Sequence, residues 1–284
     1  MSGTDKLGKI AVKRAMKEME QSDIENQDTA SELYWILFDK ENISKVQLLI
    51  QGPEGTPYEG GFYHFSCTLP ENYPFKNPSC KYLTTGQGKI RFNPNLYKCG
   101  KVCLSILGTW QGPAWSSAMN LRTLCMNLQL VLNEYPVQNE PGYEKAEPGS
   151  VTVCSYNKYV RFNVIKHAVM DHLNRKSKLP EQFQKIVDKF MVDKGLDYWM
   201  DLICKFKAKS TISGKGGEAK VYNKSDINAI DYNWEKLSQD FKTLFSKNYG
   251  FIESNNNDDK NVIRGVVTRS KSKTKTNGEV IILD

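Results

Sequence analysis

A cysteine and an asparagine stand eight residues apart in a segment that could carry out acyl transfer. Asn95 follows the turn residues Asn93 and Pro94, and Cys103 lies within Val-Cys-Leu. A thiolate is a suitable acyl carrier, because its low basicity leaves the acyl group reactive toward an amine. Transfer passes through an oxyanion, which a nearby amide N–H can stabilise. If the turn folds back, Asn95 and Cys103 can form such a site.

Other interpretations fit these residues taken one at a time. A cysteine between apolar residues is most often a small buried hydrophobe. Asn95 can also serve as a turn residue that bonds its own backbone. Cys99 and Cys103 could both bind a metal, but the chain has only three histidines and no CxxC pair. We therefore expect no zinc site.

The composition indicates a globular protein of a reducing compartment. The 284 residues are 39% hydrophobic and 11% aromatic, which allows one domain and an extension. Seven irregularly spaced cysteines suggest free thiols, and hence a cytoplasmic or nuclear location. The net charge of +7 fits an acidic partner surface, weak nucleic-acid affinity or solubility alone. Residues 1–20 are strongly charged, and no apolar stretch approaches the roughly 20 residues that span a bilayer. We expect neither membrane nor nucleic-acid partners.

The elements that must position the cysteine segment are a helix and a sheet before it. Apolar residues at helical spacing predict a helix over residues 5–21. Four short β-prone runs separated by turn signals predict an antiparallel meander; they are residues 33–38, 46–50, 62–69 and 80–83. Residues 86–117 have no clear periodicity, which predicts a long functional loop around the cysteine.

Helices are predicted after this loop. The clearest covers residues 118–133, where Cys125 falls on the apolar face, and another covers 153–173. Further amphipathic stripes, interrupted by Gly195, predict a helical extension over residues 176–250 with a linker at 208–219. The expected organisation is a core domain at residues 1–175, the helical extension at 176–250, and a disordered tail at 251–284.

Four motifs in this order resemble those of the ubiquitin-conjugating (UBC) enzyme family. Residues 91–95 (Arg-Phe-Asn-Pro-Asn), followed by the segment containing Cys103, resemble the active-site region, in which His-Pro-Asn precedes the acceptor cysteine. Here Asn93 replaces the histidine. The other motifs are residues 52–61 (Gly-Pro-Glu-Gly-Thr-Pro-Tyr-Glu-Gly-Gly), 69–78 (Leu-Pro-Glu-Asn-Tyr-Pro-Phe-Lys-Asn-Pro) and 115–118 (Trp-Ser-Ser-Ala).

The resemblance covers about residues 7–173 and implies the α+β fold of the family. That fold has an N-terminal helix, a four-stranded antiparallel meander sheet, an active-site loop and then helices, to which this chain adds its helical extension. Residues 108–110, 112–115 and 139–143 are similar to the larger Z-type members, which share the Asn-for-His change.

The resemblance also implies roles for individual residues. Cys103 would accept ubiquitin or a ubiquitin-like modifier as a thioester and pass it to a substrate lysine or a ligase cysteine. Asn95 would stabilise the oxyanion or support the loop. Asn139 or Glu140 falls nearest the position at which many members gate the acceptor lysine. Ser105 stands where many members have aspartate, which favours a cysteine acceptor.

Partner surfaces follow from the same resemblance. Lys13 and Arg14 match first-helix positions that meet the activating enzyme and ligases. Phe75 matches the exposed aromatic of the ligase-binding loop, although packing against neighbouring prolines would also explain it. Ser117 and Ala118 match the second such loop. The implied partners are the modifier, an activating enzyme, ligases and protein substrates. ATP is used by the activating enzyme, so no cofactor is expected here.

Two other functions stay open at this point. One is a catalytically silent UBC-fold scaffold or adaptor, although such variants usually lose the cysteine that this chain retains. The other is a basic interaction protein whose C-terminal region carries the main role. Truncation and binding data would separate the second from an enzyme.

Overall fold

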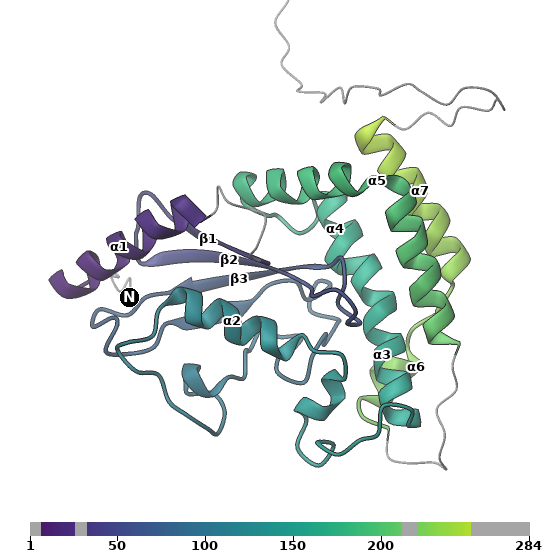
Figure 1. Cartoon of the computed structure of the whole chain (residues 1–284), viewed down its shortest axis with the longest axis horizontal. Helices are drawn as coiled ribbons and strands as arrows, with labels where there is room; N and C mark the ends of the chain where they lie inside the picture. Colours follow the sequence, from purple (N-terminus) through teal and green to yellow (C-terminus); the bar gives the residue numbers. More distant parts are fainter. Residues whose placement is uncertain (1–6, 26–32, 212–220, 251–284) are drawn as a thin grey trace, which may run out of the picture.

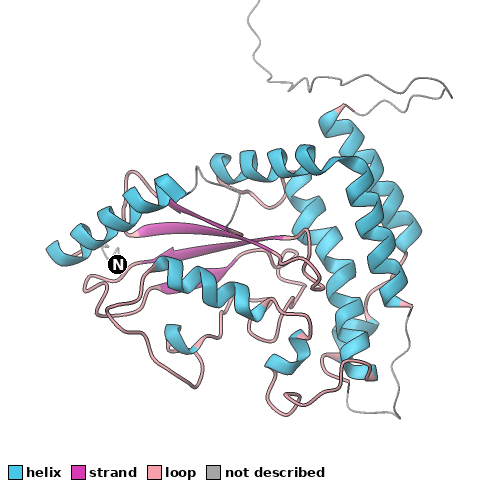
Figure 2. Cartoon of the chain, viewed as in Figure 1, coloured by secondary structure: helices cyan, strands magenta, loops and turns pink. Residues whose placement is uncertain are grey.

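The structure is a computed structural model that describes residues 7–25, 33–211 and 221–250 (Figures 1 and 2). The predicted tail at residues 251–284 and most of the predicted linker lie outside the described residues. The linker begins later than predicted, because the preceding helix continues to Ser210.

An antiparallel sheet follows the first helix, as predicted, although that helix ends at Glu25 and not at residue 21. Helix α1 (Lys9–Glu25) precedes strands β1 (Tyr34–Phe38), β2 (Lys45–Gln51), β3 (Phe62–Thr68) and β4 (Ser79–Tyr82), which pair in sequence order. Strand β1 is apolar on both sides, and most residues of β1 and β3 are buried. Such strands need a covering layer on each face.

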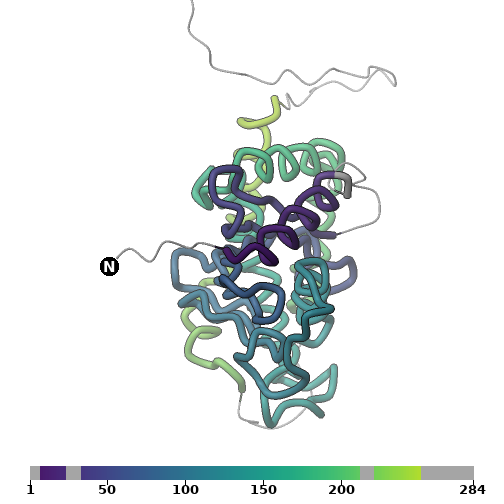
Figure 3. The backbone as a smooth tube through the Cα atoms, turned by 90° about the vertical axis from the view of Figure 1, so that its left-hand side faces the viewer, coloured from purple at the N-terminus to yellow at the C-terminus, as the bar shows by residue number. Residues whose placement is uncertain are grey.

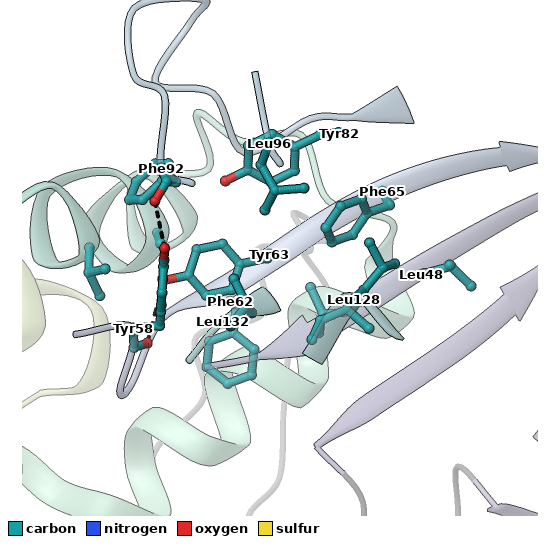
Figure 4. Close-up of a cluster of buried hydrophobic side chains, with 14 of the residues drawn as sticks. Leu48, Tyr58, Phe62, Tyr63, Phe65, Tyr82, Phe92, Leu96, Leu128 and Leu132 are labelled. Carbon is teal, nitrogen blue, oxygen red and sulfur yellow. Dashed lines mark hydrogen bonds between the residues drawn. The ribbon is translucent and has the colours of Figure 1, made fainter. Parts of the chain in front are cut away.

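Helix α2 (Leu121–Val131) covers one face of the sheet (Figure 1). Its buried residue Leu128 lies near Leu48 and Phe65, which are paired across β2 and β3 (Figure 4). The helix begins three residues later than predicted, because the Asn120 side chain accepts a hydrogen bond from the backbone N–H of Thr123 and caps the helix there.

Helix α5 (Glu181–Ser210) covers the opposite face with its first half (Figure 1). Phe183 makes an edge contact with His64 of β3, and Phe190 makes one with Phe62. The helix turns sharply at Gly195, whose backbone is left-handed, as the sequence break indicated. Figure 3 shows the first half of α5 across the top of the molecule, above the strands and the blue and teal loops that follow them.

The remaining helices pack beside the sheet. The predicted helix over residues 153–173 is observed as three continuous segments, α3 (Val151–Asn163), a π-helical turn η3 (Val164–Val169) and α4 (Met170–Leu173). Two short 3₁₀ turns, η1 (Ser105–Leu107) and η2 (Pro136–Asn139), lie in the loops. Helices α6 (Lys224–Asn228) and α7 (Trp234–Tyr249) complete the extension.

The extension shares one hydrophobic core with the preceding residues. Trp199 and Leu202 of α5 lie directly on the turn between β2 and β3. A Cβ added at Gly60 would stand 2.8 Å from Leu202 and 2.9 Å from Trp199. Only glycine therefore fits at this contact. No helix in the described part of the chain is long and apolar enough to cross a membrane.

Candidate active site

The segment between Asn95 and Cys103 folds into a tight hairpin. The Cys103 N–H donates to the Asn95 carbonyl at 2.8 Å, and the Asn95 side-chain amide donates to the Cys103 carbonyl at 2.8 Å. Leu96 and Val102 pair between them. The structure thus brings together the two residues that the sequence proposed as a pair.

The Asn95 amide is oriented toward the cysteine and is almost enclosed, with 8% of the residue exposed. Among the described residues, Nδ2 makes one hydrogen bond, to the Cys103 carbonyl, and Oδ1 makes none. Because a side-chain amide has two N–H donors, one donor can support the loop while the second is free for an oxyanion. The two roles considered for Asn95 are therefore compatible.

Thr109 supports the other side of the cysteine, and the sequence reasoning did not assign it a role. Its hydroxyl donates to the Val102 carbonyl at 2.7 Å and accepts from the Leu104 N–H at 3.0 Å. The backbone N–H groups of Cys103 and Leu104 are therefore both occupied. The sequence feature that could have pointed to Thr109 is a hydroxyl residue just after a turn glycine. Gly108 ends η1 in a left-handed conformation.

Asn93, which stands where the family has histidine, is completely buried. Its Nδ2 donates to the Val131 carbonyl at 2.6 Å and to the Tyr58 hydroxyl at 2.7 Å, and its Oδ1 accepts from the Asn95 N–H at 2.9 Å. The Tyr58 hydroxyl in turn donates to the Phe92 carbonyl at 2.8 Å (Figure 4). Asn93 therefore positions the backbone of Asn95.

The two predicted gate residues lie against this turn. Asn139 donates to the Val131 carbonyl at 3.0 Å and to Asn93 Oδ1 at 3.4 Å. Glu140 Oε2 lies 3.5 Å from Arg91 Nη2. These contacts attach the segment after α2 to the turn that carries Asn95. A gating role for Asn139 or Glu140 remains a prediction.

The two basic residues of α1 have different surroundings. Lys13 is exposed, whereas Arg14 is half-buried. Arg14 donates to Glu18 at 2.5 Å and to the Met119 carbonyl at 2.9 Å. Glu18 also accepts from the Tyr73 hydroxyl at 2.8 Å and is nearly buried. Arg14 thus connects α1 to the loop before α2, a structural role that the sequence reasoning missed.

The two predicted ligase-binding loops lie side by side. Phe75 is 65% exposed, and Ser117 and Ala118 are exposed as well. The Trp115 indole N–H donates to the Pro74 carbonyl at 2.7 Å and joins the loops. These three residues are therefore exposed on two adjoining loops, and packing against the prolines does not bury the Phe75 ring.

The thiol environments differ across the chain. Cys103 is 2% exposed, Cys67 and Cys125 are buried, and Cys99 and Cys204 are exposed. All seven cysteines lie in the described ranges, and all are free thiols. In those same ranges, no three histidine, cysteine, aspartate or glutamate side chains lie close enough together to hold a metal ion.

Comparisons with known proteins find similar sequences for about half of the chain. A family model described as "Ubiquitin-conjugating enzyme" matches residues 14–161. The chain is 42% identical over 159 residues to ubiquitin-conjugating enzyme E2 Z of Xenopus tropicalis, an alignment that covers 56% of this chain and 50% of that protein. It is 41% identical over 160 residues to the Homo sapiens E2 Z, covering 56% of this chain and 45% of the relative. The aligned region thus spans half or less of these relatives.

A solved structure of a putative ubiquitin conjugating enzyme from Plasmodium yoelii also matches. Its TM-score is 0.44 at 26% sequence identity, and the match covers 59% of this chain and 98% of that chain.

Proposed function

The chain belongs to the ubiquitin-conjugating enzyme family, and we propose that it carries ubiquitin or a ubiquitin-like modifier as a thioester on Cys103. The observation that supports this best is the pair of 2.8 Å hydrogen bonds between Asn95 and Cys103. They hold the cysteine backbone in a single geometry and direct a side-chain amide toward it. A buried structural cysteine would need neither contact.

Loading is a thiol exchange in this proposal. The Cys103 sulfur attacks the thioester carbonyl that joins the modifier to a cysteine of the activating enzyme. One carbon–sulfur bond forms and one breaks, and the Cys103 proton ends on the departing thiol. The bond energy is conserved in this exchange, so ATP is needed only by the activating enzyme and no cofactor is required here.

Discharge to an amine needs more assistance. The acceptor amine attacks the thioester carbonyl, loses a proton to solvent or a base, and releases the Cys103 thiolate. A lysine acceptor has a reference pKa of about 10.4 and must be neutral to attack. In this proposal the second Asn95 amide hydrogen donates to the oxyanion, because the backbone N–H groups of Cys103 and Leu104 are already bonded. Ser105 in place of aspartate favours a ligase cysteine as the acceptor.

Partner binding is proposed from exposure. The exposed Lys13 suits an acidic surface on the activating enzyme. Phe75, Ser117 and Ala118 form one surface for a ligase. The free thiols support a reducing compartment, cytoplasmic or nuclear.

A charging assay tests the thioester. The full chain is incubated with activating enzyme, ATP and ubiquitin, or with another modifier, and run on a gel with and without reductant. We expect a reductant-sensitive adduct that becomes a reductant-resistant oxyester in Cys103→Ser. Cys99→Ser is the matched control, because Cys99 lies in the same hairpin and is exposed. It should charge normally.

Two outcomes would contradict the proposal. If no modifier forms an adduct, the chain is better explained as a scaffold with this fold. A reductant-sensitive adduct that persists in Cys103→Ser would move the site to another cysteine.

The two roles of Asn95 can be separated by comparison with Thr109→Val. Thr109→Val removes loop support but leaves the amide in place. Asn95→Ala removes both. We expect Asn95→Ala to charge and then discharge about 10²–10³-fold more slowly, with Thr109→Val much closer to the unmodified chain. If discharge slows equally in both variants, Asn95 acts only by supporting the loop and has no role in stabilising the oxyanion.

A further inference from the structure

The C-terminal extension reaches the active-site turn through one tyrosine. Tyr222 lies just before α6 and is 8% exposed. Its ring makes edge contacts with Tyr156, at 5.2 Å between centroids, and with Tyr143, at 5.7 Å. The Arg91 guanidinium lies over the same ring, 5.4 Å from its centroid. A residue of the extension thus packs among residues that surround the proposed site.

Arg91 also contacts the turn that carries Asn95. Its Nη2 donates to the Pro94 carbonyl at 2.7 Å, and its guanidinium lies 3.9 Å from the centroid of the Tyr97 ring. Pro94 immediately precedes Asn95 in the chain. A displacement of the guanidinium would therefore move the residue next to the proposed oxyanion donor.

The same cluster contains the predicted gate. Glu140 Oε2 faces Arg91 Nη2 at 3.5 Å. Tyr143, which touches the Tyr222 ring, follows Glu140 within the same loop. Tyr222 therefore contacts both Arg91 of the turn at residues 91–95 and Tyr143 of the segment after η2.

A second contact joins the extension to the hairpin of the cysteine. Lys98 Nζ lies 3.6 Å from Asp226 Oδ1, and Lys98 belongs to the loop between Asn95 and Cys103. Lys98 is half exposed, so this ion pair contributes little by itself. Its position shows that α6 rests beside the hairpin.

Tyr222 contacts its neighbours through its aromatic ring. Its hydroxyl is buried and makes no hydrogen bond of ordinary geometry with any described residue. Burial, together with the nearby Glu140 carboxylate, raises the pKa of Tyr222, so the phenol stays neutral at physiological pH. Cation–π attraction to Arg91 and packing on the neighbouring tyrosines do not require the hydroxyl.

We propose that Tyr222 is a positioning residue that couples the C-terminal extension to the thioester site. It holds Arg91 against Pro94 and thereby keeps Asn95 in place beside Cys103 during discharge. This inference rests on the proposed function for its catalytic readout, but its structural readout is independent of ubiquitin.

Three full-length variants test the coupling. Tyr222→Ala removes the ring, and Tyr222→Phe keeps it. Tyr232→Ala removes another tyrosine of the extension that lies under a cation, Lys158, at 4.3 Å, and whose ring packs on Phe162 away from the site. We expect Tyr222→Ala to charge normally and to discharge about tenfold more slowly. Tyr222→Phe and Tyr232→Ala should discharge at the wild-type rate.

A chemical probe separates this proposal from the proposed function. Iodoacetamide alkylation of Cys103, followed by mass spectrometry of its peptide, measures how accessible the thiol is. Accessibility increases when the hairpin loosens. Cys103 is 2% exposed, so loosening the turn should raise its alkylation rate severalfold in Tyr222→Ala only. Exposed Cys204 serves as the internal reference.

The outcomes distinguish the two ideas. Faster Cys103 alkylation in Tyr222→Ala with no thioester in any variant would support the coupling and overturn the enzyme. Wild-type alkylation and discharge in Tyr222→Ala would overturn the coupling. Equal effects in Tyr232→Ala would also overturn it, because they would reflect general destabilisation.

Discussion

Replacing Asn93 by aspartate would test the buried network that positions Asn95. The two side chains have nearly the same shape, so the change alters hydrogen bonding and charge without creating a cavity. Asn93 Oδ1 accepts from the Asn95 N–H, and an aspartate can keep that bond. Nδ2, however, donates to the Val131 carbonyl and to the Tyr58 hydroxyl, and a carboxylate cannot donate to either.

The expected cost follows from burial. Asn93 is 0% exposed, so a carboxylate there would face the Val131 carbonyl without water. The carboxyl is then kept protonated in the folded state, while in the unfolded state it ionises with a pKa of about 3.9. Holding the proton at pH 7 costs up to about 4 kcal/mol, from roughly three pH units at 1.36 kcal/mol each. A protonated carboxyl has one donor instead of two, which adds about 1 kcal/mol.

The sign of the pH dependence distinguishes this cause from simple packing damage. A raised folded-state pKa makes the penalty grow with pH above about 3.9. The loss of stability should therefore be about 5 kcal/mol at pH 7 and about 3 kcal/mol smaller at pH 4.5.

Urea unfolding of the variant and the unmodified chain at both pH values measures this difference. Protonation of native histidines affects the two proteins equally and cancels. Asn72→Asp, at an exposed position, is the control and should change stability by less than about 0.5 kcal/mol. A loss for Asn93→Asp below about 2 kcal/mol at pH 7, or one that does not vary with pH, would refute the reasoning.

Two further predictions concern the extension and the buried histidines. Gly60→Ala should cost about 2–4 kcal/mol in urea unfolding, because φ is 79° and the added Cβ meets Trp199 at 2.9 Å. Gly55→Ala, with φ of 80° and no atom within 4 Å, should cost only about 1 kcal/mol, and equal losses would contradict the packing argument. Burial lowers the pKa of His172 to about 4, so the folded state resists a proton that the unfolded state accepts below about pH 6.5. Stability should fall by about 2 kcal/mol between pH 6.5 and 4.5 through His172. His172→Gln should make that slope shallower and leave the part due to His64, whose pKa burial also lowers to about 4; an unchanged slope would show that His172 does not take up the proton.

The exposed aromatic and the inward arginine show why a match to a family position does not by itself identify a partner contact. Phe75 is 65% exposed and stays available for binding. Arg14 instead uses its guanidinium on Glu18 and the Met119 carbonyl. Helical spacing places both Lys13 and Arg14 on the outer part of α1. The position of the loop before α2 determines that Arg14 is covered and that Lys13 stays exposed.

Local sequence determined the elements and the hairpin of the proposed site. Short-range hydrogen bonding and steric preference act over a few residues, so periodicity and turn chemistry were sufficient. The four strands, the apolar face of α2 and the break at Gly195 were predicted on this basis and confirmed. The approach of Asn95 to Cys103 followed from a turn and a short return, both within one hairpin.

Only the tertiary structure decided which distant surfaces meet. An apolar stripe indicates that a helix face is buried, but it does not specify the surface that buries it. The contact of Trp199 with Gly60 and the stacking of Tyr222 near Arg91 join segments far apart in the chain. Such contacts depend on how all layers pack at once, because interiors are filled to high density and each side chain's place depends on its neighbours. The pairing of Asn95 with Cys103 was therefore predictable from the sequence, whereas the contact between the C-terminal extension and Arg91 became visible only in the fold.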